Sequence, residues 1–171
     1  MRKTKQITLS ALFAALGTAV LALASLTEVA DLAISMFAAA LLMLAMIEIG
    51  EKQAFMIYAA TSLLSLMLLP NKFIAAVYLV FTGLYPLIKR HFDKLGRVLS
   101  ILLKLIYFNG ALTVALVLAR FVFLIEGYSD WLLVGYYVLA NLCFWLFDIL
   151  IKRLTVVYMT RYRDKFKKFF K

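Results

Sequence analysis

Charged residues are scarce in this chain of 171 residues. They make up 16% of the sequence, whereas soluble domains carry about 25%. Hydrophobic residues reach 65%, above the roughly 45–50% of a soluble domain, and the mean hydropathy is +0.96. The composition therefore excludes a water-soluble protein and predicts segments that lie in a lipid bilayer.

One cysteine and one histidine limit the chemistry that the chain can hold. Cys143 lies inside an apolar segment, which excludes a disulfide within the chain and a cysteine metal site. His91 falls in a basic loop, and the sequence contains neither a paired histidine motif nor a glycine-rich phosphate loop. Glu48 and Glu51 lie close in sequence, but at a helix end where Lys52 can neutralise them. We therefore predict no enzymatic activity, no metal site and no cofactor.

Six apolar segments account for most of the chain. Crossing a hydrocarbon core of ~30 Å takes about 20 mostly apolar residues in a helix, so six crossings leave only short loops and no second domain. The sequence therefore predicts an all-α, polytopic membrane protein, a single bundle of six transmembrane helices. The expected spans are residues 7–26, 32–49, 54–69, 73–88, 98–125 and 131–151, and residues 152–171 are expected to form a basic cytoplasmic tail.

The third and fourth segments are short and are joined by the turn Pro70-Asn71-Lys72. A hairpin that does not fully cross the bilayer is one interpretation. Two complete crossings agree better with the distribution of charge, and we adopt them.

Lysine and arginine are distributed unevenly between the two sets of loops. With six crossings and a cytoplasmic N-terminus, Lys72 is the one basic residue in an outer loop, among 19 in the chain. Lys104 and Arg120 lie within the fifth span, where Lys104 can extend to the cytoplasmic surface. Basic residues favour the cytoplasmic side, so we predict a multi-pass protein of the cell membrane with both termini cytoplasmic. The net charge of +10 then reflects topology and anionic lipid headgroups, and we expect no binding of nucleic acid.

Polar and aromatic residues gather where the outer half of the bundle is expected. An ionisable side chain inside a span is costly unless it faces protein or water, which draws attention to Arg120. Such a group can form a small-molecule pocket open to the outside, with an anionic solute held by the arginine. The candidate substrate-binding residues are Arg120, Asn141, Lys72, Tyr136, Tyr137 and Trp131.

Each of these residues also has a structural interpretation. Arg120 can extend outward to pair with an acidic residue of the next loop, and Asn141 can hold two helices together. Trp131 can belong to the aromatic belt at the membrane surface. Near the other end of the sixth span, Asp148 and Lys152 have the spacing of an ion pair within one helix.

Small residues recur at four-residue spacing in the first span, residues 7–26. Ala11, Ala15 and Ala19 lie on one face of a helix and leave that face nearly flat. Close approach of backbones through small side chains is a main way for helices to associate in lipid. We predict that this row is a partner interface, and packing against the chain's own helices is the alternative.

The segment from Ala11 to Ala15, reached within a few residues of a short basic N-terminus, resembles the start of the substrate-binding S-components of energy-coupling factor vitamin transporters. Those are small six-helix proteins with both termini inside. The resemblance implies that Ala11 and Ala15 dock on a transmembrane coupling subunit that carries two cytosolic ATPases. It also implies that a vitamin-like solute binds near the outer face, and that the partners hydrolyse ATP when the solute is handed over.

Small polytopic proteins of the rod-shape, cell-wall elongation machinery are similar in length, number of spans and basic termini. They act as scaffolds and need no solute pocket. A non-transporting membrane scaffold of a cell-envelope complex is therefore the alternative function.

Overall fold

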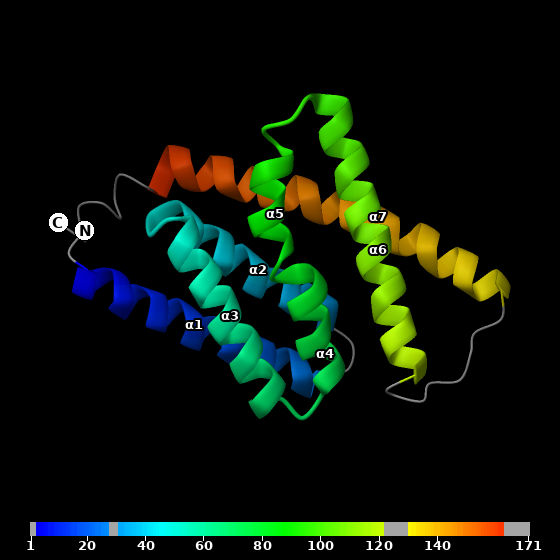
Figure 1. The fold of residues 1–171 in the computed structure, drawn as a ribbon, viewed down its shortest axis with the longest axis horizontal. Coiled ribbons are helices and arrows are strands. Elements are labelled where there is room, and N and C mark those ends of the chain that lie inside the picture. The colour runs from blue at the N-terminus through cyan, green and yellow to red at the C-terminus, as the bar shows by residue number, and fades with distance from the viewer. Residues whose placement is uncertain (1–2, 28–30, 122–129, 163–171) are drawn as a thin grey trace.

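The computed structural model describes residues 3–27, 31–121 and 130–162, and these residues form helices joined by short connections (Figure 1). None of the three ranges contains a strand, which confirms the predicted all-α fold. The helices are α1 (Lys3–Leu26), α2 (Asp31–Glu48), α3 (Glu51–Leu68), α4 (Lys72–Val77), α5 (Tyr85–Phe92), α6 (Arg97–Phe121) and α7 (Asp130–Val157). Two π-helical segments, η1 (Tyr78–Thr82) and η2 (Tyr158–Tyr162), follow α4 and α7.

Several of these helices have the length and composition of membrane spans. Within the described residues, four helical stretches are long and apolar enough to cross a membrane, and the apolar part of α2, Ala33–Glu48, is shorter. The four stretches are Thr4–Leu26, Lys72–Phe92, Val98–Val117 and Trp131–Arg161. The chain is therefore a membrane protein, and the side chains called exposed below face lipid or water around the isolated chain.

The helix bounds agree closely with expectation in α1, α2 and α3 and differ in the later segments. The fourth expected span is interrupted, because α4, η1 and α5 follow one another over Lys72–Phe92. The sixth is longer than expected, because α7 and η2 continue to Tyr162 and include the first residues of the expected tail. Residues 122–125 of the fifth expected span and 163–171 of the tail lie outside the described residues.

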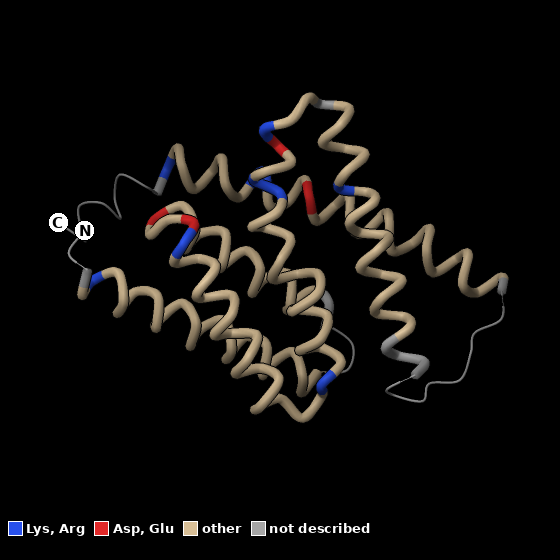
Figure 2. The backbone as a smooth tube through the Cα atoms, viewed as in Figure 1, with Lys and Arg blue, Asp and Glu red and all other residues tan. Residues whose placement is uncertain are grey.

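The described ends of the chain lie on the same side of the molecule. The first turn of α1 (blue) and the end of the helix that continues α7 (red) are both at the left in Figure 1. Charged residues gather toward that side and around the α5–α6 connection, with one basic residue at the α3–α4 turn as the exception (Figure 2). We call the charged side the inner end, since the distribution of basic residues predicts that it is cytoplasmic.

Helices α1, α2 and α3 pack closely through small residues. A Cβ atom at Gly17 of α1 would lie 3.3 Å from Cγ2 of Thr61 on α3. Ala14, Ala45 and Ala54, one from each helix, belong to one buried cluster. These side chains let the backbones approach, which is a main source of helix association in lipid.

The stretch Lys72–Phe92 contains irregular backbone at η1. The carbonyl oxygen of Leu79 accepts a hydrogen bond from the hydroxyl of Tyr58 on α3, at 2.6 Å, and that of Val80 accepts one from Tyr107 on α6, at 2.7 Å. Backbone groups inside a membrane must find partners within the protein. The two neighbouring helices therefore supply hydrogen bonds at the point where α4 passes into α5.

Candidate functional site

Two of the predicted outer-site residues contact α6. The amides of Asn141 on α7 and Asn109 on α6 exchange two hydrogen bonds, of 3.1 and 3.2 Å. Asn141 also donates to the carbonyl oxygen of Tyr137, at 2.8 Å, and the hydroxyl of Tyr137 lies 2.9 Å from Oγ1 of Thr113. These contacts match the structural interpretation of Asn141, in which it holds α6 and α7 together.

The contacts of Lys72, another predicted outer residue, are at the end of α3. Nζ of Lys72 donates to two carbonyl oxygens in the last turn of α3, at 2.8 and 3.3 Å, and so caps that helix. Trp131 is 87% exposed, and Tyr136 is exposed as well. Arg120 lies in α6, and its side chain is outside what the structure describes.

The predicted partner interface lies on the surface of α1. Ala11, Ala15 and Ala19 are all exposed. The neighbouring face of α1, which includes Ala14 and Thr18, is buried. The described part of the chain therefore packs against one side of α1 and leaves the alanine row uncovered.

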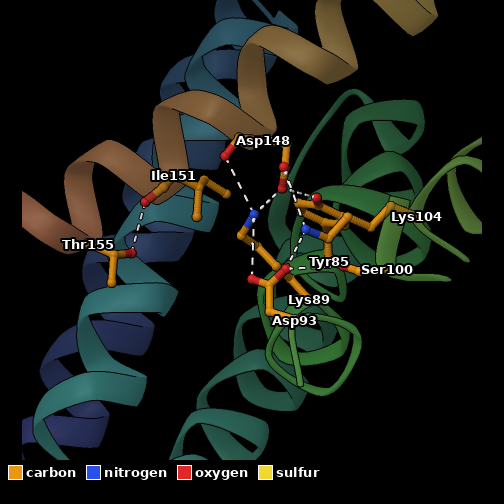
Figure 3. Close-up of polar contacts among 8 residues, drawn as sticks. All are labelled: Tyr85, Lys89, Asp93, Ser100, Lys104, Asp148, Ile151 and Thr155. Atoms are coloured by element: carbon orange, nitrogen blue, oxygen red, sulfur yellow. Dashed lines mark hydrogen bonds and ion pairs between the residues drawn. The ribbon is translucent and has the colours of Figure 1, made fainter. Parts of the chain in front are cut away.

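A second polar group, which the sequence analysis did not identify, lies toward the inner end of α5, α6 and α7 (Figure 3). Lys89 of α5 and Lys104 of α6 are 2% and 8% exposed. Asp148 of α7 forms an ion pair with Lys89, and its Oδ2 lies 3.6 Å from Nζ of Lys104. Asp93, which follows α5, pairs with Lys104 and lies 3.9 Å from Nζ of Lys89. We call these four residues the charge cluster.

Helical spacing explains how the charge cluster forms. Tyr85 and Lys89 are four residues apart and share one face of α5, and Asp93, directly after α5, continues the same spacing. The hydroxyl of Tyr85 donates to Oδ1 of Asp148, so this carboxylate has partners on two helices. Two cations face two anions, and this balance is the condition under which buried charges are tolerated.

The predicted pairing of Asp148 with Lys152 is not formed in the described structure. The ion pairs of Asp148 are with lysines of α5 and α6, and Lys152 is exposed. The side chain of Lys104 likewise pairs with two carboxylates instead of extending alone to the surface.

An aromatic layer lies between the amide pair and the charge cluster along α6 and α7. The rings of Phe108 on α6 and Phe144 on α7 stack, with centroids 4.5 Å apart and planes inclined by 9°. The ring of Tyr85 meets Phe144 edge-on at 5.2 Å, and both belong to a buried cluster that includes Phe81 and Phe147. The amide pair, the aromatic layer and the charge cluster therefore follow one another along α6 and α7. Together they join these two helices to each other and to α5.

Three cavities lined by described residues have none of the predicted outer residues in their walls. One of about 360 Å³ runs between α2 and α7, and an open one of about 820 Å³ lies between α3 and α5 beside Glu51 and His91. Lys104 and Asp148 border a cavity of about 20 Å³, which is room for about one water molecule. Within the described residues, no group of three or more His, Cys, Asp or Glu side chains is placed to hold a metal ion.

Comparison with known proteins identifies no relative of this chain. No family model, no curated protein and no solved structure matches the chain. The function is therefore inferred from the residues and contacts described above.

Proposed function

We propose that this chain is the membrane-embedded binding subunit of a small-solute importer, a multi-pass protein of the cell membrane that docks on a transmembrane partner. The observation that carries the proposal is the exposed row of Ala11, Ala15 and Ala19 on a helix whose neighbouring face is buried. A row of small side chains lets a second helix come close enough to bind in lipid. The partner subunits would hydrolyse ATP, as the resemblance to the S-components implies.

The solute in this proposal is small and anionic. Arg120 is placed by sequence in the outer part of α6, and an arginine in that position is tolerated where water or an anion meets it. The exposed aromatic residues Trp131 and Tyr136, near the start of α7, can cover a flat ring of the solute. The amide of Asn141 and the amine of Lys72 have partners within the chain, so the arginine is the proposed charged anchor.

A scaffold without solute is the second candidate. It is favoured by the internal partners of Asn141, Tyr137 and Lys72, which leave these predicted contacts occupied by the protein itself. A scaffold would use the same alanine row on α1 and would require no pocket. The two candidates therefore share the docking face and differ in the solute and in the ATPase.

The docking face is tested by adding bulk to it. The double variant Ala11→Leu/Ala15→Leu should keep the thermal midpoint of the wild type, because both positions are exposed. It should lose its membrane partner in co-purification, since the helices can no longer approach. The matched control Ala59→Leu/Ala60→Leu adds the same bulk to exposed positions of α3 and should keep the partner. Full retention of the partner by the α1 variant would exclude this face.

The solute is tested by thermal-shift screening of the purified chain against small anionic metabolites. A ligand at 100 times its Kd stabilises the folded state by about 2.7 kcal/mol, which is measurable. Arg120→Ala should abolish the shift, and Arg153→Ala, an exposed arginine at the inner end, should leave it unchanged. Partner retention with no stabilising anion and no ATPase subunit in the complex would support the scaffold instead.

A further inference from the structure

The hydrogen bonds between α6 and α7 use every side-chain proton of four polar residues. We call these residues, Asn109, Thr113, Tyr137 and Asn141, the oxygen patch. The amide of Asn109 donates to the carbonyl oxygen of Leu105, at 2.9 Å, and to Oδ1 of Asn141, at 3.2 Å. The amide of Asn141 donates to Oδ1 of Asn109 and to the carbonyl oxygen of Tyr137, at 3.1 and 2.8 Å. A side-chain amide carries two protons, so neither amide has a proton left to donate.

The two hydroxyl groups of the oxygen patch are in the same condition. Oγ1 of Thr113 donates to the carbonyl oxygen of Asn109 at 2.8 Å, which uses its one proton. The hydroxyl of Tyr137 lies 2.9 Å from Oγ1 of Thr113 and is therefore the donor in that pair. Both hydroxyl oxygens keep a lone pair for a further bond. The oxygen patch can thus accept hydrogen bonds from another molecule but cannot donate one.

The hydroxyl pair is accessible from the side of the outer helix ends. Thr113 is exposed, and Tyr137 is half-buried. Beyond this contact α6 and α7 diverge toward the end of α6 and the start of α7 (Figure 1). Val117, one turn further along α6, is 49% exposed, and Val134, about one turn earlier in α7, is 59% exposed. These two side chains therefore leave the hydroxyl pair open on this side.

Helical geometry relates the hydroxyl pair to the proposed charged anchor. Arg120 follows Thr113 by seven residues, which is almost two complete turns, so the two positions lie on one face of α6. Seven residues rise about 10 Å along the helix axis. A small molecule with a ring and a short acidic chain is long enough to extend from one position to the other.

We propose that the imported solute carries an N–H or O–H group besides its anionic group, and that the hydroxyl oxygens of Thr113 and Tyr137 accept a hydrogen bond from it. This inference rests on the proposed import function, in which Arg120 holds the anion. A carbonyl, an ether or a second anion would meet oxygen atoms that have no proton to give, and an unpaired acceptor costs its desolvation. The oxygen patch therefore selects a solute that has a donor.

Matched probes that differ in one proton test this inference on the purified full chain. The probes are phenylacetate, phenylpropionate and phenylbutyrate, each with a hydroxyl or a methoxy group in the para position. Both members of a pair have the same ring and carboxylate, but the methoxy member has no donor. Affinities are measured from thermal shifts over a concentration series. For the chain length that binds best, the wild type should bind the hydroxy member about fivefold more tightly than the methoxy member.

Variants of the hydroxyl pair should change this preference in a defined direction. Thr113→Val removes the acceptor of the Tyr137 proton, so that proton becomes free for the ether oxygen of the methoxy probe. The preference for the hydroxy member should then fall below about twofold, and Thr113→Ser, which keeps the hydroxyl, should retain it. Tyr137→Phe removes one acceptor, and it should weaken the hydroxy member alone.

A threonine at the inner end provides the matched control. Thr160 is exposed and donates to the carbonyl oxygen of Val156 within its own helix, at 3.0 Å. Thr160→Val should therefore leave both affinities and their ratio as in the wild type. Arg120→Ala should weaken both members of each pair equally, because both carry the carboxylate.

Three results would overturn the inference. Equal affinity of the wild type for the two members, with both lost in Arg120→Ala, would leave the import function in place and exclude the hydroxyl pair as a contact. No binding of any probe would count against the inference and the proposed solute together. Loss of the co-purifying membrane partner in Thr113→Val, with an unchanged probe preference, would assign the oxygen patch to a partner helix instead.

Discussion

Helices α1 to α3 and the pair α6–α7 are held together by different kinds of contact. In the first group small residues bring backbones together, as at Gly17 and Thr61. In the second, an amide pair, a stack of two rings and the charge cluster join helices whose other side chains are largely exposed. Lipid offers no hydrophobic drive between helices, so close packing and polar pairs are the two available means of association. Stability is spread over many small contacts in one region and concentrated in a few residues in the other.

Breaking the charge cluster should have the largest effect. Asp148→Leu leaves Lys89 buried without its main partner, and removal of one member of a buried ion pair costs about 3–5 kcal/mol. The measurement is reversible unfolding of the purified chain in mixed micelles. The double variant Lys89→Met/Asp148→Leu should lose much less, because the pair of Lys104 with Asp93 remains.

An exposed residue one turn further along α7 provides the matched control. Lys152→Met should change the free energy of unfolding by less than about 0.5 kcal/mol in lipid-free micelles. If Asp148→Leu were equally mild, α7 would not depend on the charge cluster, and the contrast between the two regions would fail.

The same substitution at two glycines sharpens the contrast, one between η1 and α5 that packs against Tyr58 of α3 and one in α6. A Cβ atom at Gly83 would lie 2.7 Å from the buried ring of Tyr78 and 2.9 Å from Tyr58, so Gly83→Ala should cost about 1–3 kcal/mol. A Cβ atom at Gly110 in α6 meets nothing within 4 Å. Gly110→Ala should therefore stabilise the chain by up to about 1 kcal/mol through helix propensity. Unfolding midpoints that move in the same direction would contradict this difference in packing.

The amide pair should make the smallest contribution of the three. Asn109→Ala, Asn141→Ala and the double variant form a cycle whose coupling energy reports the pair alone. Polar pairs between membrane helices average about 0.6 kcal/mol, with a maximum near 1.7 kcal/mol, and we expect a value in this range. A coupling energy of zero would show that the two side chains act independently and that the aromatic layer and the charge cluster carry the interface.

Hydropathy was sufficient to predict the all-α architecture and most helix bounds. A helix in lipid satisfies its own backbone, so its presence depends on local composition. The interruption at η1 was not predicted, because its carbonyl groups depend on tyrosines from α3 and α6. The sequence also does not predict that α7 continues through the first part of the basic tail, because lysine and arginine there indicate the end of a span.

The charge cluster was missed because its members are distant in sequence. Lys104 and Asp148 each had a local explanation, an extended side chain for one and a pair with Lys152 for the other. A signal was nevertheless present, since the two residues lie at similar depth in consecutive spans of opposite direction and carry opposite charge. Residue type and depth predict the outer candidates, and these two properties do not distinguish a pocket from the contact that Asn141 makes with Asn109.

The irregular backbone at η1 bears on the order of assembly during synthesis. Tyr107, which hydrogen-bonds to Val80, belongs to a helix that the ribosome makes after the stretch Lys72–Phe92. When that stretch first enters the bilayer, this donor has not been made, and an unpaired carbonyl in hydrocarbon is costly. We therefore expect the stretch to insert as a regular helix and to acquire its π-turn when α6 arrives. Insertion of the stretch into the bilayer and formation of the π-helical turn at η1 would then be two separate steps, the second of which requires α6.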